Sequence, residues 1–223
     1  MHFEIMRPTF NHFFHTARTT ILTEQSLNKA ENSMSIISEH FQASAKSILD
    51  NQHLEAQIEA AAKTIFSSFE AGGKLLICGN GGSAADAQHL SSELLNRYKR
   101  ERRELPGIAL TTDGSTLTSI GNDYDYSEVF SKQVNALGQQ GDCLMVITTS
   151  GNSSNIIKAV KVAHNKGVTV IALNGKSGGA LSPELNESDV DLLVKGDVTA
   201  RIQEVHGLII HCICELIDHY ILD

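Results

Sequence analysis

Short apolar runs alternate along this chain with longer segments whose apolar residues recur at helical spacing. The runs predict strands at 74–78, 108–110, 144–147, 168–173 and 190–194. The helical spacing predicts helices at 34–49, 54–70, 84–98, 114–120, 129–137, 156–164 and 199–222. Strands that alternate with helices are typical of parallel sheets covered on both faces. The pattern therefore predicts a three-layer, doubly wound, mostly parallel α/β fold of the flavodoxin-like kind.

Residues 1–33 carry no clear period and are interpreted as an N-terminal extension of unknown role. The first patterned segment begins at Met34, so the predicted domain covers residues 34–223. Two amphipathic helices precede the first strand. They could cover one face of the sheet or pair with another subunit.

Charge and cysteine content exclude several classes of protein. A net charge of −8 over 223 residues argues against a nucleic-acid surface, which needs clustered Lys and Arg. The basic cluster Arg97–Arg103 is interrupted by Glu101, and we interpret it as a solvated helix end rather than a phosphate-facing patch. The four cysteines are Cys78, Cys143, Cys212 and Cys214, and they indicate buried thiols in a reducing compartment. With no predicted membrane span or signal peptide, a cytoplasmic protein is expected.

A glycine-rich turn follows the first predicted strand and leads directly into a helix. It reads Asn80, Gly81, Gly82, Ser83, and it matches neither a Walker loop nor a dinucleotide fingerprint. A glycine turn at a helix N-terminus presents backbone N–H groups and the positive end of the helix dipole. The turn therefore predicts an anion site, although the same turn also occurs without a ligand.

A second loop of this kind follows the strand predicted at 144–147. Its hydroxyl side chains are Thr148, Thr149, Ser150, Ser153 and Ser154. Ser153 or Ser154 is expected to cap the helix that follows. In an open parallel sheet both loops lie at the carboxyl edge, where ligands bind. Together they predict one phosphorylated ligand.

Polar side chains on two predicted helices could carry chemistry. His89 and Glu93 are four residues apart on the helix that leaves the first loop, and the last helix offers Gln203 and His211, with Glu204 and His206 nearby. Imidazole and carboxylate groups suit either a divalent metal or an acid/base pair. They could equally be exposed polar groups, and His211 could be a core histidine. Asp123 is either a ligand contact or a helix cap.

Four segments resemble the sugar isomerase (SIS) domain family, and within it the phosphoheptose isomerases. The segments are CGNGGSAADAQHLSSELLNRY, IGNDYDYSEVFSKQV, TTSGNSSNIIKA and ARIQEVHGLIIH. The resemblance runs from about Met34 to the C-terminus. It implies conversion of sedoheptulose 7-phosphate to D-glycero-D-manno-heptose 7-phosphate, an early step toward the heptose of lipopolysaccharide. It also implies a homotetramer with one zinc ion per subunit.

The resemblance also implies roles for particular residues. The zinc ligands would be His89, Glu93, Gln203 and His211. Glu93 would act as the base and His211 as the acid in a proton transfer between C1 and C2 through an enediol. Phosphate and sugar would contact Asn80, Gly81, Gly82, Ser83, Asp123, Thr148, Thr149, Ser150, Ser153 and Gln203. Ligation and proton transfer would then compete for the same side chains.

One position departs from the family pattern. Ala200 stands where phosphoheptose isomerases usually carry an Asp that contacts the sugar. The same Ala, with the Cys-x-Cys-x-Leu-Ile-Asp ending from Cys212 to Asp218, resembles the SIS protein that binds the bacterial replication initiator DnaA. An adaptor of replication initiation and a non-catalytic sugar-phosphate sensor are therefore the alternatives. Glu93 and His211 are not both expected in the adaptor, so their presence favours an enzyme.

Overall fold

The computed structural model describes residues 35–223 and divides into two units, residues 1–39 and residues 40–223. Of the first unit only Ser35 and the start of helix α2 are described. The predicted extension at 1–33, like Met34, lies outside the described residues.

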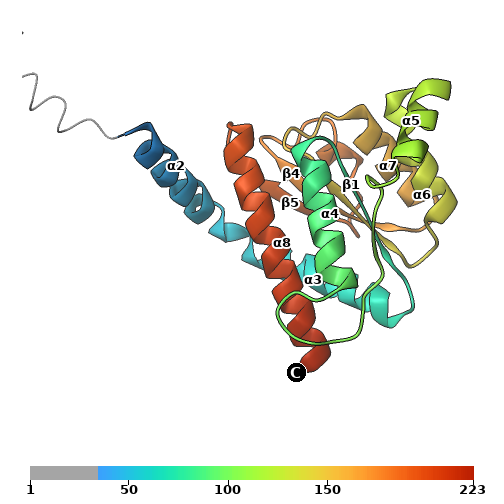
Figure 1. Cartoon of the computed structure of the whole chain (residues 1–223), viewed down its shortest axis with the longest axis horizontal. Helices are drawn as coiled ribbons and strands as arrows, with labels where there is room; N and C mark the ends of the chain where they lie inside the picture. Colours follow the sequence, from blue (N-terminus) through green and yellow to red (C-terminus); the bar gives the residue numbers. More distant parts are fainter. Residues whose placement is uncertain (1–34) are drawn as a thin grey trace, which may run out of the picture. The chain divides into compact units, whose positions relative to one another are not determined.

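A parallel sheet of five strands forms the centre of the fold (Figure 1). Its strands are β1 (Leu75–Gly79), β2 (Gly107–Ala109), β3 (Cys143–Ile147), β4 (Thr169–Gly175) and β5 (Val190–Val194). Their order is β2-β1-β3-β4-β5, and every neighbouring pair is parallel. The predicted doubly wound, flavodoxin-like architecture is confirmed, including β5 at one edge.

The helices largely match the predicted segments. They are α2 (Ile36–Asp50), α3 (Glu55–Glu70), α4 (Gly82–Leu95), α5 (Gly114–Asp123), α6 (Ser131–Leu137), α7 (Ser154–Asn165) and α8 (Thr199–Leu222). Short 3₁₀ turns lie at Gln52–Leu54 (η1), Tyr126–Glu128 (η2) and Ser182–Glu184 (η3). Most helix ends lie within two residues of the prediction, and the two largest differences are three residues: α4 ends early, at Leu95, and α5 continues through Asp123.

Helices cover both faces of the sheet, and the strand sequence shows why. Leu75 and Ile77 of β1 point into a core with α3, α4 and α8, whereas Leu76 and Cys78 point into a core with α6 and α7. All five residues of β1 are buried. A strand that is buried on both faces reads as a continuous apolar run, which is why β1 and β3 could be identified from composition alone.

Helix α8 has the predicted bounds and is long and apolar. Its 24 residues have a mean hydropathy of 1.4 over the most apolar window, so by length and composition it could cross a membrane. No such segment was expected from the sequence. In this fold α8 packs its apolar side against α3, α4 and the sheet, and 44% of that window is buried. Part of an apolar helix therefore remains uncovered.

The strand order reverses between β1 and β3, and this reversal places the ligand crevice. Gly79 at the end of β1 pairs with Ile147 at the end of β3, so the loops that follow start side by side. The loop after β1 leads into α4 on one face of the sheet, and the loop after β3 leads into α7 on the other. In open parallel sheets a ligand is expected to bind between two such loops.

His206 belongs to the core rather than to the polar cluster predicted on α8. Its side chain is fully buried, and its Nε2–H donates to the Asn174 carbonyl at 2.9 Å. Nδ1 is buried without a hydrogen-bond partner among residues 35–223. Burial lowers the pKa of this imidazole to about 4 from an ordinary 6.5, against the hydrogen bond to Asn174, which raises it.

Because of His206, the free energy of unfolding is expected to fall in acid. The unfolded chain takes up the proton as the pH falls through 6.5, but the folded chain resists until about pH 4, so protonation favours unfolding across that window. Between pH 7 and pH 4 the free energy of unfolding should fall by about 3 kcal/mol through this group. Urea unfolding of wild type and His206→Gln at both pH values measures it. If the free energy of unfolding fell equally in the two proteins between pH 7 and pH 4, His206 would not be the source of the acid sensitivity.

Candidate active site

The first loop forms a tight turn between β1 and α4. The N–H of Ser83 donates to the Asn80 carbonyl and that of Ala84 to the Gly81 carbonyl, both at 3.0 Å. These two amides were expected to be free for an anion and are instead used by the turn. The Ser83 side chain is 7% exposed at the start of α4, where a helix dipole favours negative charge. Its hydroxyl has no hydrogen bond recorded within residues 35–223, and its predicted contact with a phosphate stays a prediction.

The second loop is braced by its own hydroxyls. Oγ1 of Thr148 accepts from the N–H of Gly151 at 3.2 Å and of Ser150 at 3.4 Å, and Oγ of Ser150 accepts from the N–H of Asn152 at 3.3 Å. Ser153 occupies the cap position of α7, as predicted, but its side chain makes no capping hydrogen bond. Ser153 and Thr149 are only partly buried. Their hydroxyls, like that of the exposed Ser154, have no hydrogen bond recorded within residues 35–223.

A glycine is required at position 151. Gly151 has a φ of 66°, and a Cβ there would lie 2.0 Å from the carbonyl oxygen of Gly178. The second loop thus packs against the backbone of the loop after β4. The N–H of Leu181 donates to the Gly151 carbonyl at 2.9 Å and completes this contact.

A pair of amides joins the two loops. Nδ2 of Asn80 donates to Oδ1 of Asn155 at 2.9 Å, and Nδ2 of Asn155 donates back to Oδ1 of Asn80 at 2.8 Å. The hydroxyl of Tyr126 also donates to Oδ1 of Asn80, at 3.2 Å. Asn155 is 2% exposed and was not among the predicted site residues. Asn80, which was expected to contact the sugar, therefore also fixes the spacing of the two loops.

Helices α4 and α8 lie side by side and bring the predicted polar residues together (Figure 1). Nε2 of His89 lies 3.2 Å from Oε1 of Glu93 and 3.4 Å from Nε2 of His211. The two imidazole rings meet edge to face at 83°. The Glu93 side chain is 21% exposed, so it is partly shielded from water but reachable. Two histidines and a carboxylate thus converge below the first loop.

Gln203 lies nearer the first loop than the histidines do. A Cβ on Gly82 would come 2.1 Å from Nε2 of Gln203, so this glycine leaves room for the amide. The amide also donates to Oδ2 of Asp86 at 3.5 Å. Burial raises the pKa of the half-buried Asp86 carboxyl, while the Gln203 hydrogen bond and the charge of His89 act in the opposite direction. Asp86 was missed from the sequence, although it lies three residues before His89 on the same helix.

The donor set fits a zinc ion in its chemistry. Zn²⁺ binds imidazole nitrogen at about 2.0–2.1 Å in tetrahedral sites, which puts two such nitrogens about 3.4 Å apart. His89 and His211 show this separation. Among residues 35–223, however, no three His, Cys, Asp or Glu side chains are already arranged as a metal site. The predicted fourth ligand, Gln203, is engaged with Asp86.

Asp123 is neither a cap nor part of a loop. It is the last residue of α5, exposed, and its Oδ1 accepts from Nδ2 of Asn122 at 2.8 Å. The residue that caps α5 is Asp113, whose carboxylate accepts from the N–H groups of Ser115 and Thr116. Asp123 stands three residues before Tyr126, whose hydroxyl reaches the first loop. Its predicted contact with the sugar stays a prediction.

The basic segment 97–103 differs from both sequence interpretations. It lies beyond the end of α4, and one of its arginines is buried: the Arg102 side chain is 1% exposed and its Nε lies 3.0 Å from Oδ1 of Asp218 on α8, itself 3% exposed. Arg102 also donates to the Glu93 carbonyl at 2.6 Å and to the Leu94 carbonyl at 2.9 Å. A guanidinium that satisfies the last carbonyls of a helix ends it there, which is why α4 stops at Leu95.

Comparisons of the sequence and of the structure with known proteins point to the same family. The model of the SIS domain family matches residues 40–175. The phosphoheptose isomerase of Thiobacillus denitrificans is 55% identical over 184 residues, which cover 82% of this chain and 93% of the relative. The solved phosphoheptose isomerase of Neisseria gonorrhoeae is 47% identical with a TM-score of 0.79, covering 82% of this chain and 97% of its own. That of Francisella tularensis gives the same identity and TM-score, covering 87% and 98%.

Proposed function

From its place among the phosphoheptose isomerases of the SIS domain family, to which this chain belongs, we infer that it converts sedoheptulose 7-phosphate to D-glycero-D-manno-heptose 7-phosphate. The observation that carries the proposal is the meeting of His89, Glu93 and His211 beside two joined loops at the carboxyl edge of the sheet. The product would supply the heptose of lipopolysaccharide.

The proposed reaction moves one proton between neighbouring carbons. Glu93 removes a proton from C1 of the ketose while His211 gives a proton to the oxygen on C2, which yields the enediol. Glu93 then returns a proton to C2, and His211 takes the proton from the oxygen on C1, which leaves the aldose. The 3.4 Å contact between the histidines supports this division, because it places His211 in the same cluster as the base.

Zinc is proposed as the metal, held by His89, Glu93, Gln203 and His211. Bound there, it would supply Lewis-acid polarisation of the substrate oxygens. For Gln203 to join, its amide must leave Asp86 and present its oxygen. Because Glu93 is a poorer base when ligated, the same carboxylate would have to alternate between the metal and the proton.

The phosphate is proposed to lie between the two loops. Ser83, Thr149 and Ser153 offer hydroxyls there, and Thr148 and Ser150 shape the second loop from within. The helix N-termini of α4 and α7 both favour an anion. Asp123 and Asn80 are left to contact the sugar hydroxyls.

The decisive experiment follows the reaction in deuterated water by NMR. Zinc-loaded protein is incubated with sedoheptulose 7-phosphate, and an aldoheptose phosphate is expected to appear. Deuterium at C2 would show exchange of the transferred proton with solvent, and its absence would show that the proton is retained. A folded, zinc-containing protein that forms no aldose would overturn the proposal and favour a sugar-phosphate sensor or adaptor.

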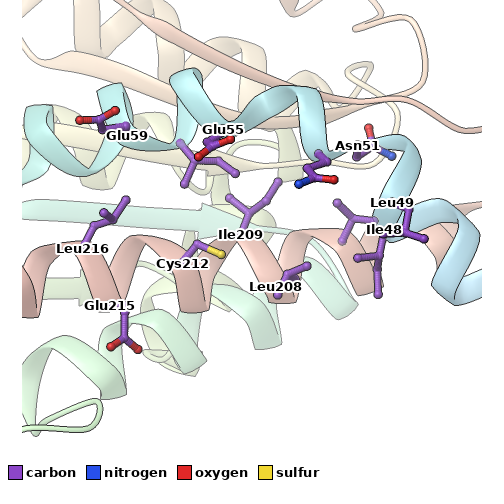
Figure 2. Close-up of a pocket in the computed structure, with 13 residues that line it drawn as sticks. Ile48, Leu49, Asn51, Glu55, Glu59, Leu208, Ile209, Cys212, Glu215 and Leu216 are labelled. Atoms are coloured by element: carbon purple, nitrogen blue, oxygen red, sulfur yellow. The ribbon is translucent and has the colours of Figure 1, made fainter.

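A homotetramer, which the family resemblance implies, is proposed, and an apolar groove left uncovered beside α8 offers one of its interfaces. The groove holds about 570 Å³ between α8 and the segment from α2 to α3 (Figure 2). Leu49 is 69% exposed and Leu208 is 41% exposed on its two sides. An exposed apolar surface of this kind is typical of interfaces between subunits, and a self-complementary face pairs two copies about a twofold axis.

Leu208→Lys is therefore expected to break the assembly. A charge on α8 at the groove would have to be buried between subunits, which is unfavourable. Light scattering after size exclusion should show smaller species than for wild type. The matched control is Leu137→Lys on α6, which is 42% exposed on the opposite face and should leave the assembly unchanged. A Leu208→Lys protein with wild-type mass would place the interface elsewhere.

A further inference from the structure

An aromatic ring from the basic segment rests on the proposed acid. The ring of Tyr98 stacks on the imidazole of His211 with centroids 5.6 Å apart and planes 24° from parallel. On its other contact, His211 meets His89 edge to face at 5.0 Å. The His211 ring is therefore held by two aromatic neighbours from different segments. Its hydrogen-bonding atom, Nε2, is directed toward His89.

The segment that carries Tyr98 is anchored both to the end of α4 and to α8. After α4 ends, the chain crosses α8 before reaching β2 (Figure 1). Four residues beyond Tyr98, Arg102 is buried against Asp218 and binds the carbonyls at the end of α4. Asp218 lies seven residues after His211, two turns along the same face of α8. The ion pair thus fixes this loop to the helix that bears His211.

We propose that Tyr98 is a positioning residue that fixes the imidazole ring of His211, in a loop anchored by the buried Arg102–Asp218 pair. Stacked aromatic rings prefer a narrow range of offsets, so the contact limits rotation of the imidazole about its side-chain bonds. The inference deepens the proposed function, on which it rests. Tyr98 itself is given no proton to move and no contact with substrate.

The role requires a flat ring and not the phenol hydroxyl. Tyr98→Phe keeps the ring and is the matched control for Tyr98→Leu, which removes it. Residues that orient a metal-binding histidine by hydrogen bonding typically contribute about 10- to 100-fold to metal affinity or activity, and we expect the stacked ring to act at the lower end of that range. Tyr98→Leu is expected to lower kcat about 10-fold, with KM for sedoheptulose 7-phosphate changed less than about twofold. Tyr98→Phe should stay within about twofold of wild type in both constants.

A second readout does not depend on turnover. Competition with a chromophoric zinc chelator, without substrate, should show about 10-fold weaker zinc binding for Tyr98→Leu and wild-type binding for Tyr98→Phe. If the leucine variant does not fold, Tyr98→Met removes the ring while filling more of its space. A loss of equal size in the phenylalanine and leucine variants would overturn the positioning role, as would wild-type values in both.

Failure of the proposed function is separately visible in the wild-type protein. A wild type that neither converts the ketose phosphate nor binds zinc would overturn both proposals. A wild type that converts it, with Tyr98→Leu equally active and equally tight for zinc, would overturn only the role of Tyr98.

Discussion

Glu93→Gln is expected to lower kcat by about 10²- to 10⁴-fold, the range that a positioned general base contributes. The substitution keeps the shape of the side chain but removes the carboxylate that lies 3.2 Å from His89. The helix should be unaffected, because the residue is partly exposed and no described hydrogen bond of the fold depends on its side chain apart from this contact. Turnover of sedoheptulose 7-phosphate by NMR measures the effect.

Two controls make the Glu93 result interpretable. Glu104→Gln changes an exposed carboxylate outside the site and should leave kcat unchanged. Zinc content and thermal unfolding of Glu93→Gln separate lost proton transfer from lost metal or lost fold. Wild-type turnover by Glu93→Gln would rule out Glu93 as the base.

Arg102→Met is expected to destabilise the fold by about 3–5 kcal/mol, the usual cost of removing one partner of a buried ion pair. The substitution leaves the Asp218 carboxylate, 3% exposed, without its cation. It also leaves the carbonyls of Glu93 and Leu94 without their donor. Urea unfolding monitored by circular dichroism measures the loss.

An exposed ion pair nearby provides the comparison. Arg100 pairs with Asp223, but the two side chains are 47% and 43% exposed, so Arg100→Met should change stability little. The double variant Arg102→Met, Asp218→Leu should lose less stability than Arg102→Met alone, because no unpaired charge remains buried in it. Equal stability of the Arg100 and Arg102 single variants would show that the buried pair is not needed.

The sequence predicts the layers of this fold well because they depend on local patterns. β1 and β3 are continuous apolar runs, and α8 carries its apolar residues along most of its length. The early end of α4 could not be predicted, because it depends on Arg102 meeting Asp218, which lies 116 residues away. The helical spacing of the sequence continues past Leu95, but the chain leaves the helix there to make the contact between Arg102 and Asp218.

The candidate site was predicted in part for the same reason. His89, Glu93 and His211 stand out as titratable side chains at helical spacing on apolar helices, and the structure brings them together. Asn155 gave no such signal, because an Asn near a helix start is ordinary and its partner Asn80 lies 75 residues earlier. His206 looked like a member of the cluster, but its position on α8 turns it toward Asn174 and the core.

The amide pair between Asn80 and Asn155 carries no charge and does not titrate over the pH range in which proteins stay folded. Salt does not screen it, and a change of pH does not weaken it. The distance between the two loops that would hold a phosphate is therefore set by a neutral contact, which a change of pH leaves in place.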